Sequence, residues 1–141
     1  KDGGLIETEL PNGVKHTYER IPAHIFEDEV KASNRIAEKI IEAINTTSGT
    51  YRLGLSTGSS PIYIYRELVK RHKAGEVSFA NVAVYSLDEF YPIAPTEKQS
   101  RNYRIHEEFI DQVDIKSENI HLIDGNVPLS ELSAYCATYD Q

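Results

Sequence analysis

The sequence has little that would suit an extracellular or membrane-embedded protein. Its 141 residues include a single cysteine, Cys136, so they form no internal disulfide, and such usage suits a reducing compartment. No Cys/His cluster has the spacing of zinc ligands. No apolar run is long enough to span a bilayer, and no stretch has the basic start and apolar core of a secretory signal. We therefore expect a cytoplasmic protein that has no metal site and does not enter a membrane.

An excess of positive charge is also missing. The chain has 15 Lys and Arg against 22 Asp and Glu, a formal net charge of -7. Nucleic acids and anionic membranes both need a clustered excess of basic residues, so neither is expected as a partner. A small phosphorylated molecule remains compatible with this charge, because backbone N–H groups and one or two basic side chains can hold one phosphate.

The hydrophobic pattern predicts alternating helices and strands. With 40% hydrophobic and 26% charged residues, the chain fits one globular domain or a large piece of one. Helical periodicity runs from about 27 to 49, restarts at Pro61 and returns around 103–113, whereas short apolar runs predict strands at 51–55, 82–85 and 120–123. Alternation of this kind predicts an α/β fold of Rossmann-like type, an open parallel sheet with helices on both faces.

The two ends of the chain differ from this pattern. Residues 1–20 are polar, with a turn at Pro11-Asn12-Gly13, and are expected to form a hairpin or arm that extends from a domain at 21–141. At the other end, apolar residues at helical spacing predict a helix with no stop signal before Gln141. Three strands are also few for such a sheet, so we expect a truncated parent domain; a frayed natural C-terminus is the alternative.

The strongest local motif is Gly54-Leu55-Ser56-Thr57-Gly58-Ser59-Ser60-Pro61, between a predicted strand and a predicted helix. Gly58 can adopt a positive φ, Ser60 can cap the helix and Pro61 suits its first turn. The helix N-terminus and the hydroxyls of Ser56, Thr57, Ser59 and Ser60 then form a cradle for a phosphate or for sugar hydroxyls. The glycine spacing fits neither a Walker loop nor a dinucleotide fingerprint. An ordinary capped turn is the alternative.

A second motif, Asp88-Glu89, follows the strand predicted at 82–85. The carboxyl ends of parallel strands lie along one edge of the sheet, so the Ser/Gly loop and Asp88 should meet there. A carboxylate beside a sugar phosphate can act as a general base or bind the sugar hydroxyls. We expect Glu89 to support the loop instead. The alternative is that Asp88 and Glu89 are loop carboxylates that only face solvent and have no functional role.

Beyond these motifs the chain resembles the glucosamine-6-phosphate deaminase (isomerase) family, collinearly from about Ile21 to Gln141. The resemblance rests on the Gly54–Pro61 loop and on Tyr65–Val69, His72–Gly75, Val77–Phe79, Leu87–Phe90, Ser100 with Tyr103, Val113–Ile115, Glu118–Ile120 and Asp124-Gly125. It implies that Ser56, Thr57, Gly58, Ser59 and Ser60 bind the sugar phosphate and that Asp88 is the base of an enolisation.

The implied reaction converts glucosamine 6-phosphate to fructose 6-phosphate and ammonia without a metal or redox cofactor. The family's ring-opening Asp-x-His and Glu and its later phosphate-binding Arg and Lys would follow Gln141, so the 141 residues alone are expected to be inactive. Two alternatives stay open. A 6-phosphogluconolactonase shares the fold, but such lactonases resemble Asp-Glu-Arg where this chain has Phe90 after Glu89. A non-catalytic sugar-phosphate sensor is the other. The exact sugar and any homo-oligomer also remain open.

Overall fold

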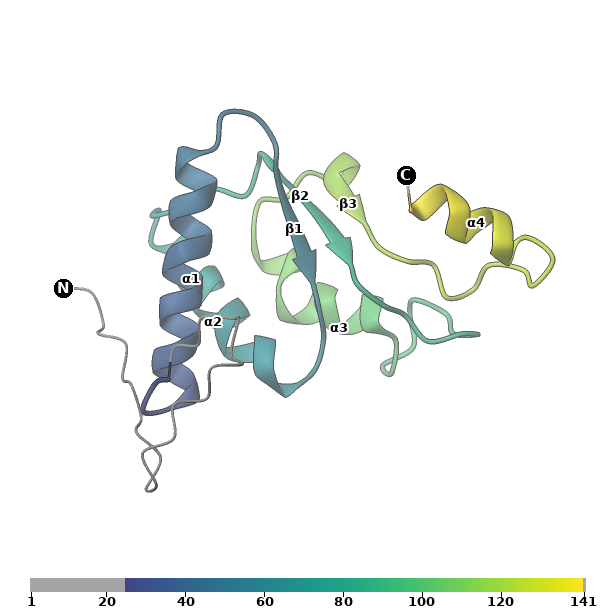
Figure 1. Ribbon diagram of the computed structural model, residues 1–141, viewed down its shortest axis with the longest axis horizontal. Helices are drawn as coiled ribbons and strands as arrows, with labels where there is room; N and C mark the ends of the chain where they lie inside the picture. The colour runs from purple at the N-terminus through teal and green to yellow at the C-terminus, as the bar shows by residue number, and fades with distance from the viewer. Residues whose placement is uncertain (1–24, 141) are drawn as a thin grey trace, which may run out of the picture.

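The computed structural model describes residues 25–140, so the arm expected at 1–20 lies outside the described residues. The elements follow one another along the chain as shown in Figure 1. They are α1 (Glu29–Thr46), β1 (Tyr51–Leu55), α2 (Ser59–Lys73), β2 (Val82–Ser86), α3 (Arg101–Glu108), the 3-10 turns η1 (Ile110–Gln112) and η2 (Ser117–Asn119), β3 (Ile120–His121) and α4 (Leu132–Tyr139).

The three strands form one parallel sheet in the order β1-β2-β3. The predicted α/β class and open parallel sheet are therefore confirmed. Leu53 pairs with Val84, and Val84 pairs with Ile120, so the inward apolar residues of neighbouring strands lie side by side. All three strands run in one direction, and their carboxyl ends lie along the lower edge of the sheet in Figure 1.

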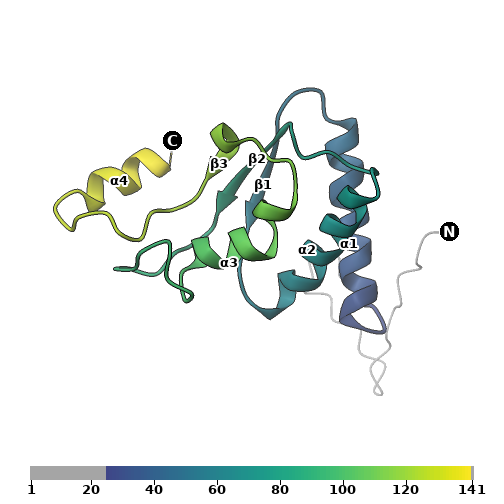
Figure 2. The same cartoon turned by 180° about the vertical axis from the view of Figure 1, so that it is seen from behind.

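The main core lies between the sheet and the helices α1, α2 and α3. Tyr65 of α2 stacks on Phe109, with ring centroids 5.2 Å apart, and Phe79 meets Phe109 edge to face at 5.3 Å. α2 and α3 cover the same face of the sheet, which is the face toward the viewer in Figure 2. On the other face Arg52 and Gly54 are exposed and Tyr85 stacks on His121. The expectation that helices also cover this second face stays a prediction.

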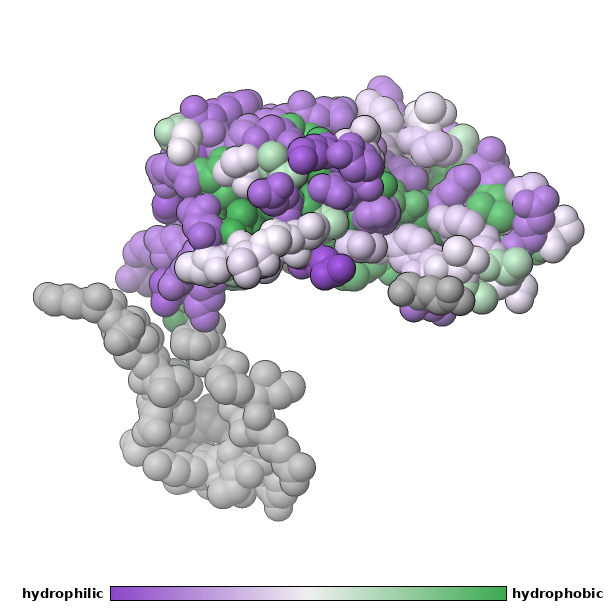
Figure 3. Space-filling model, turned by 90° about the horizontal axis from the view of Figure 1, so that it is seen from above, coloured by the Kyte–Doolittle hydropathy of each residue, from purple (hydrophilic) through white to green (hydrophobic). Residues whose placement is uncertain are grey.

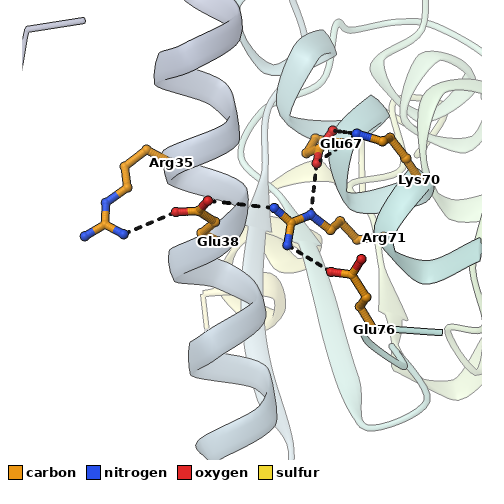
Figure 4. A network of polar contacts seen from close by, with 6 residues as sticks. All are labelled: Arg35, Glu38, Glu67, Lys70, Arg71 and Glu76. Atoms are coloured by element: carbon orange, nitrogen blue, oxygen red, sulfur yellow. Dashed lines mark hydrogen bonds and ion pairs between the residues drawn. The ribbon is translucent and has the colours of Figure 1, made fainter. Parts of the chain in front are cut away.

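An ion network joins α1 to α2 (Figure 4). The Arg71 guanidinium lies 2.9 Å from carboxylate oxygens of both Glu67 and Glu76, and 3.8 Å from Glu38 of α1. The Arg71 hydrogen bond lowers the pKa of Glu67 despite the burial of that side chain. The network therefore links the two helices. The basic run Lys70-Arg71-His72-Lys73 by itself indicates a solvated helix end, and Lys70 and Lys73 are exposed, but Arg71 is held among the three carboxylates.

The C-terminal helix α4 packs through tyrosines rather than through Cys136, which is exposed. The Tyr139 hydroxyl donates to the backbone oxygens of Ser86 and His121, at 2.8 and 3.1 Å. The Tyr135 hydroxyl accepts from the N–H of Asp124 at 2.7 Å. These bonds attach α4 to the ends of β2 and β3.

The face seen in Figure 3 is mostly hydrophilic, with hydrophobic residues showing in separate areas between polar ones. Among residues 25–140 no helix has both the length and the apolar character that crossing a bilayer requires.

Candidate functional site

The glycine-rich loop joins β1 to α2 at the carboxyl edge of the sheet. Gly58 has φ 122° and ψ -175°, which confirms the predicted positive φ and is a conformation that residues with a Cβ rarely adopt. α2 begins at Ser59, so the prediction that Ser60 caps it is wrong, and Gly58 is the N-cap. Pro61 can stand third in the helix because the first N–H positions of a helix have no intrahelical acceptor.

This start leaves the amide groups around Gly58 available to a ligand. No side chain caps the N-terminus of α2. The N–H groups of Gly58, Ser59 and Ser60 precede the first turn of intrahelical bonds, and the helix dipole adds partial positive charge there. The side chains of Ser59 and Ser60 are exposed at the same end of α2. The loop therefore offers amides and hydroxyls that suit an anion.

Tyr65 clamps the first residue of this loop. Its hydroxyl accepts from the Ser56 N–H at 3.1 Å and donates to the Ser56 carbonyl oxygen at 2.7 Å. Tyr65 lies in the second turn of α2, and its residue is only 5% exposed. The helical periodicity that restarts at Pro61 places Tyr65 on the inward face but does not predict this contact, because a helical pattern shows which face is buried and not which backbone group a hydroxyl reaches.

The buried Tyr65 hydroxyl gives stability a dependence on alkaline pH. Burial raises the pKa of Tyr65 from 10.0 to about 12, although its bonds with Ser56 lower it. Tyr65 therefore ionises at a lower pH in the unfolded chain than in the folded protein. Its contribution to the free energy of unfolding is complete below pH 10 and is lost as pH rises toward 12. We expect the free energy of unfolding to fall over this range by about 2 to 3 kcal/mol more in the wild type than in Tyr65→Phe.

Urea denaturation at a series of pH values measures this difference. Tyr65→Phe should be about 1 kcal/mol less stable at neutral pH, since its hydroxyl bonds are gone. Tyr63→Phe, on the same helix but with no hydrogen bond from its hydroxyl to the described residues, is the matched control and should behave as the wild type. An equal alkaline loss in wild type and Tyr65→Phe would contradict the assignment.

Asp88 lies at the same edge of the sheet as the loop. Leu55 pairs with Ser86 at the ends of β1 and β2, and the Leu87 N–H donates to the Leu55 carbonyl at 3.1 Å. This register places the residues after β1 beside the residues after β2, as the two motifs predicted. The Asp88 side chain is 57% exposed and is therefore open to a ligand.

Arg101 connects these two segments. Its Nη1 donates to Thr57 Oγ1 at 2.7 Å, and its Nε donates to Asp88 Oδ2 at 3.2 Å. Its guanidinium also lies over the Phe90 ring, 4.4 Å from the centroid. Sequence reasoning missed Arg101; its one sequence signal is a cation directly after Ser100, at the start of the helix that follows the Asp88 loop.

Glu89 holds the N-terminus of α3, which confirms that it supports the loop. One carboxylate oxygen accepts from the N–H groups of Phe90 and Arg101, at 2.8 and 2.9 Å. The other accepts from the Ser100 hydroxyl and the Asn102 N–H, at 2.7 and 2.9 Å. Burial would raise the pKa of Glu89, but these donors outweigh it and hold its pKa below the ordinary value.

The turn at Asp124-Gly125 supports the loop that contains Asp88 and Glu89. Gly125 is buried, and its carbonyl accepts from the Ile93 N–H at 2.8 Å. A Cβ on Gly125 would lie 2.6 Å from Ile93 Cγ2 and 2.9 Å from Glu89 Cγ, so only glycine fits without moving the loop. The Asp88 segment is thus held by the turn on one side and by α3 on the other.

These parts combine an anion cradle with an exposed carboxylate. Loop amides and hydroxyls can bind a phosphate, and a carboxylate near it can move a proton on the bound molecule. The structure brings Thr57 and Asp88 together through Arg101, and it places Ser56, Gly58, Ser59 and Ser60 along the same loop and first turn of α2.

Comparison with known proteins agrees with this arrangement. A family model described as glucosamine-6-phosphate isomerases/6-phosphogluconolactonase matches residues 27–141. Glucosamine-6-phosphate isomerase of Candida albicans is 39% identical over 117 residues, which cover 83% of this chain and 46% of that protein. Glucosamine-6-phosphate deaminase of Porphyromonas gingivalis is 39% identical over 110 residues, covering 78% and 41%. The chain therefore spans less than half the length of these curated relatives.

Two solved structures share the fold. A monomeric glucosamine-6-phosphate deaminase superposes with a TM-score of 0.76 at 25% identity, covering 82% of this chain and 47% of that one. 6-Phosphogluconolactonase from Thermotoga maritima superposes with a TM-score of 0.67 at 21% identity, covering 83% and 50%.

Proposed function

This chain belongs to the family of glucosamine-6-phosphate isomerases and 6-phosphogluconolactonases, and on that premise we propose that the complete protein converts glucosamine 6-phosphate to fructose 6-phosphate and ammonia. The observation that carries the proposal is the Arg101 guanidinium, which bonds to both Thr57 of the loop and Asp88. A single sugar phosphate can therefore contact the glycine-rich loop and the Asp88 carboxylate at the same time. The curated relatives are named glucosamine-6-phosphate isomerase and deaminase, which favours this reaction over lactone hydrolysis.

Each part of the site has a role in this reaction. Ser56, Thr57, Gly58, Ser59 and Ser60 hold the phosphate through amides and hydroxyls. In the open-chain sugar, the Asp88 carboxylate takes the proton from C2 and returns it to C1. O1 gains a proton and the nitrogen loses one, so the C1 aldehyde and the C2 amine become a C1 hydroxymethyl group and a C2 imine. Water then adds to C2 and ammonia leaves, so one water is consumed for each fructose 6-phosphate formed. A cytoplasmic location stays a prediction, and the oligomeric state stays open.

A substrate panel with the complete protein tests the proposal. We expect ammonia release from glucosamine 6-phosphate, and a kcat/KM at least about a hundredfold lower for glucosamine, because binding of the remote phosphate supports the chemical step. 6-Phosphogluconolactone should be hydrolysed no faster than the uncatalysed rate. Faster lactone hydrolysis without ammonia release would indicate a lactonase, and binding of the sugar phosphate without turnover would indicate a sensor.

A further inference from the structure

Among residues 25–140, Arg101 is the residue whose side chain hydrogen-bonds to both the glycine-rich loop and Asp88, and it lies outside both motifs. Its guanidinium bonds to Thr57 Oγ1, 44 residues earlier in the chain, and to Asp88 Oδ2, 13 residues earlier. We infer that Arg101 is a positioning residue, which fixes the Asp88 carboxylate relative to the phosphate loop. The inference rests on the proposed function, and it concerns a residue that acts through Asp88 rather than on the substrate.

Arg101 is itself held at two points, its backbone N–H and its guanidinium. Its backbone N–H donates to Glu89 at 2.9 Å, as the first residue of α3. The Phe90 ring lies 4.4 Å beneath its guanidinium, and its side chain is 28% exposed. A guanidinium in a fixed plane loses less rotational freedom on bonding than a flexible ammonium would. Arg101 can therefore transmit the position of α3 to the two groups that it bonds.

Asp88, by contrast, has little else to orient it. Its side chain is 57% exposed and follows the end of β2 on a loop. Among residues 25–140 the bond from Arg101 is the one that orients its carboxylate. That bond engages Oδ2, so Oδ1 is the oxygen available to take a proton. Because a shift of about 1 Å in a reacting group can lower a rate by roughly a hundredfold, the bond has a direct consequence for turnover.

A lysine in place of Arg101 would reproduce only part of these contacts. An ammonium carries the charge but is a single point, so it can approach either Thr57 or Asp88 and cannot form the flat two-sided bridge. If the bridge matters, Lys should restore part of the lost rate. If charge alone matters, Lys should restore all of it. If Arg101 instead binds the substrate phosphate, its loss should raise KM and leave kcat nearly unchanged.

Three variants of the complete protein separate these cases. We expect Arg101→Gln to lower kcat about a hundredfold with KM for glucosamine 6-phosphate within about twofold, and Arg101→Lys to fall between it and wild type. Arg104→Gln is the matched control, since Arg104 lies on the same helix and pairs with Glu108 instead, so it should match wild type. A raised KM with unchanged kcat, or full recovery in Arg101→Lys, would overturn the inference.

A second measurement needs no substrate. Backbone amide exchange of residues 56–58 and 87–90 should be about tenfold faster in Arg101→Gln, since charge-assisted bonds to both segments are lost, and unchanged in Arg104→Gln. Unchanged exchange in Arg101→Gln would reject positioning even if the protein acts on another substrate. Absence of ammonia release by the wild type would instead reject the proposed function, and the exchange result would still decide the role of Arg101.

Discussion

Asp88→Asn is expected to remove exchange of the C2 proton with solvent while leaving binding of the sugar phosphate intact. Asparagine keeps the shape of the side chain, and its oxygen can still accept the bond from Arg101 Nε, but it cannot accept a proton from carbon at a useful rate. We expect the exchange rate to fall by at least about a thousandfold, which is within the range for loss of a general base. The dissociation constant for fructose 6-phosphate should change by less than about threefold, because the phosphate seat lies on the loop.

Deuterium incorporation at C2, followed by NMR in heavy water, measures the exchange separately from ammonia release. Asp111→Asn provides a matched control, since Asp111 is an exposed carboxylate beyond α3 that pairs with His106. This control should exchange the proton as the wild type does. Exchange at the wild-type rate in Asp88→Asn would show that another group is the base, even if ammonia release were slow for a different reason.

The features predicted correctly are those that depend on local pattern and on the topology of parallel strands. The strand at 82–85 and the positive φ of Gly58 follow from short-range residue choice. The shared edge of the loop and Asp88 follows once consecutive strands pair in parallel, because that geometry leaves one place for both. The predicted cap at Ser60 is two residues too late, because α2 begins at Ser59 and its N-cap is Gly58. Ser59 and Ser60 can each begin a helix before Pro61, so the local pattern does not fix the start.

The features missed are those that arise between distant segments. Arg101 meets Thr57 across 44 residues, and no periodicity specifies which cation will fold back over which loop. The Tyr65 clamp on Ser56 needs the angle between α2 and β1, which packing of the core decides. Charge pattern alone made the basic end of α2 look solvated, whereas Arg71 is enclosed by three carboxylates. Contacts of this kind can be identified only once the helices and strands are placed in three dimensions.

The largest effect on stability among the site residues is expected at Glu89, whose carboxylate accepts four hydrogen bonds. Glu89→Ala would leave the hydroxyl of the fully buried Ser100 and three backbone N–H groups without that acceptor. It would also remove a negative charge from the N-terminus of α3, where the helix dipole favours it. We expect the free energy of unfolding to fall by about 3 kcal/mol, because bonds to a charged acceptor are strong but do not add fully.

Glu89→Gln sharpens the test because it changes one oxygen to a donor. Each carboxylate oxygen accepts from two donors, so whichever position the amide nitrogen takes, it faces two donors instead of an acceptor. The loss should therefore be nearly as large as in Glu89→Ala. Glu107→Gln, exposed on the same helix, should leave stability within about 0.5 kcal/mol of wild type.

The dependence on acid follows from the same bonds. The pKa of Glu89 is lower in the folded protein, because the donors that contact it favour the carboxylate despite its burial. Its contribution is therefore complete above the ordinary pKa of a glutamate and is lost as pH falls through the folded value. Urea denaturation should show that the free energy of unfolding falls less steeply with acid in Glu89→Gln than in wild type.

Because Glu89 also sets the start of α3, and hence the position of Arg101, both Glu89 variants should lose turnover even at temperatures where they remain folded. A Glu89→Gln variant with wild-type stability and turnover would mean that neither the helix nor the Arg101 bridge depends on this carboxylate.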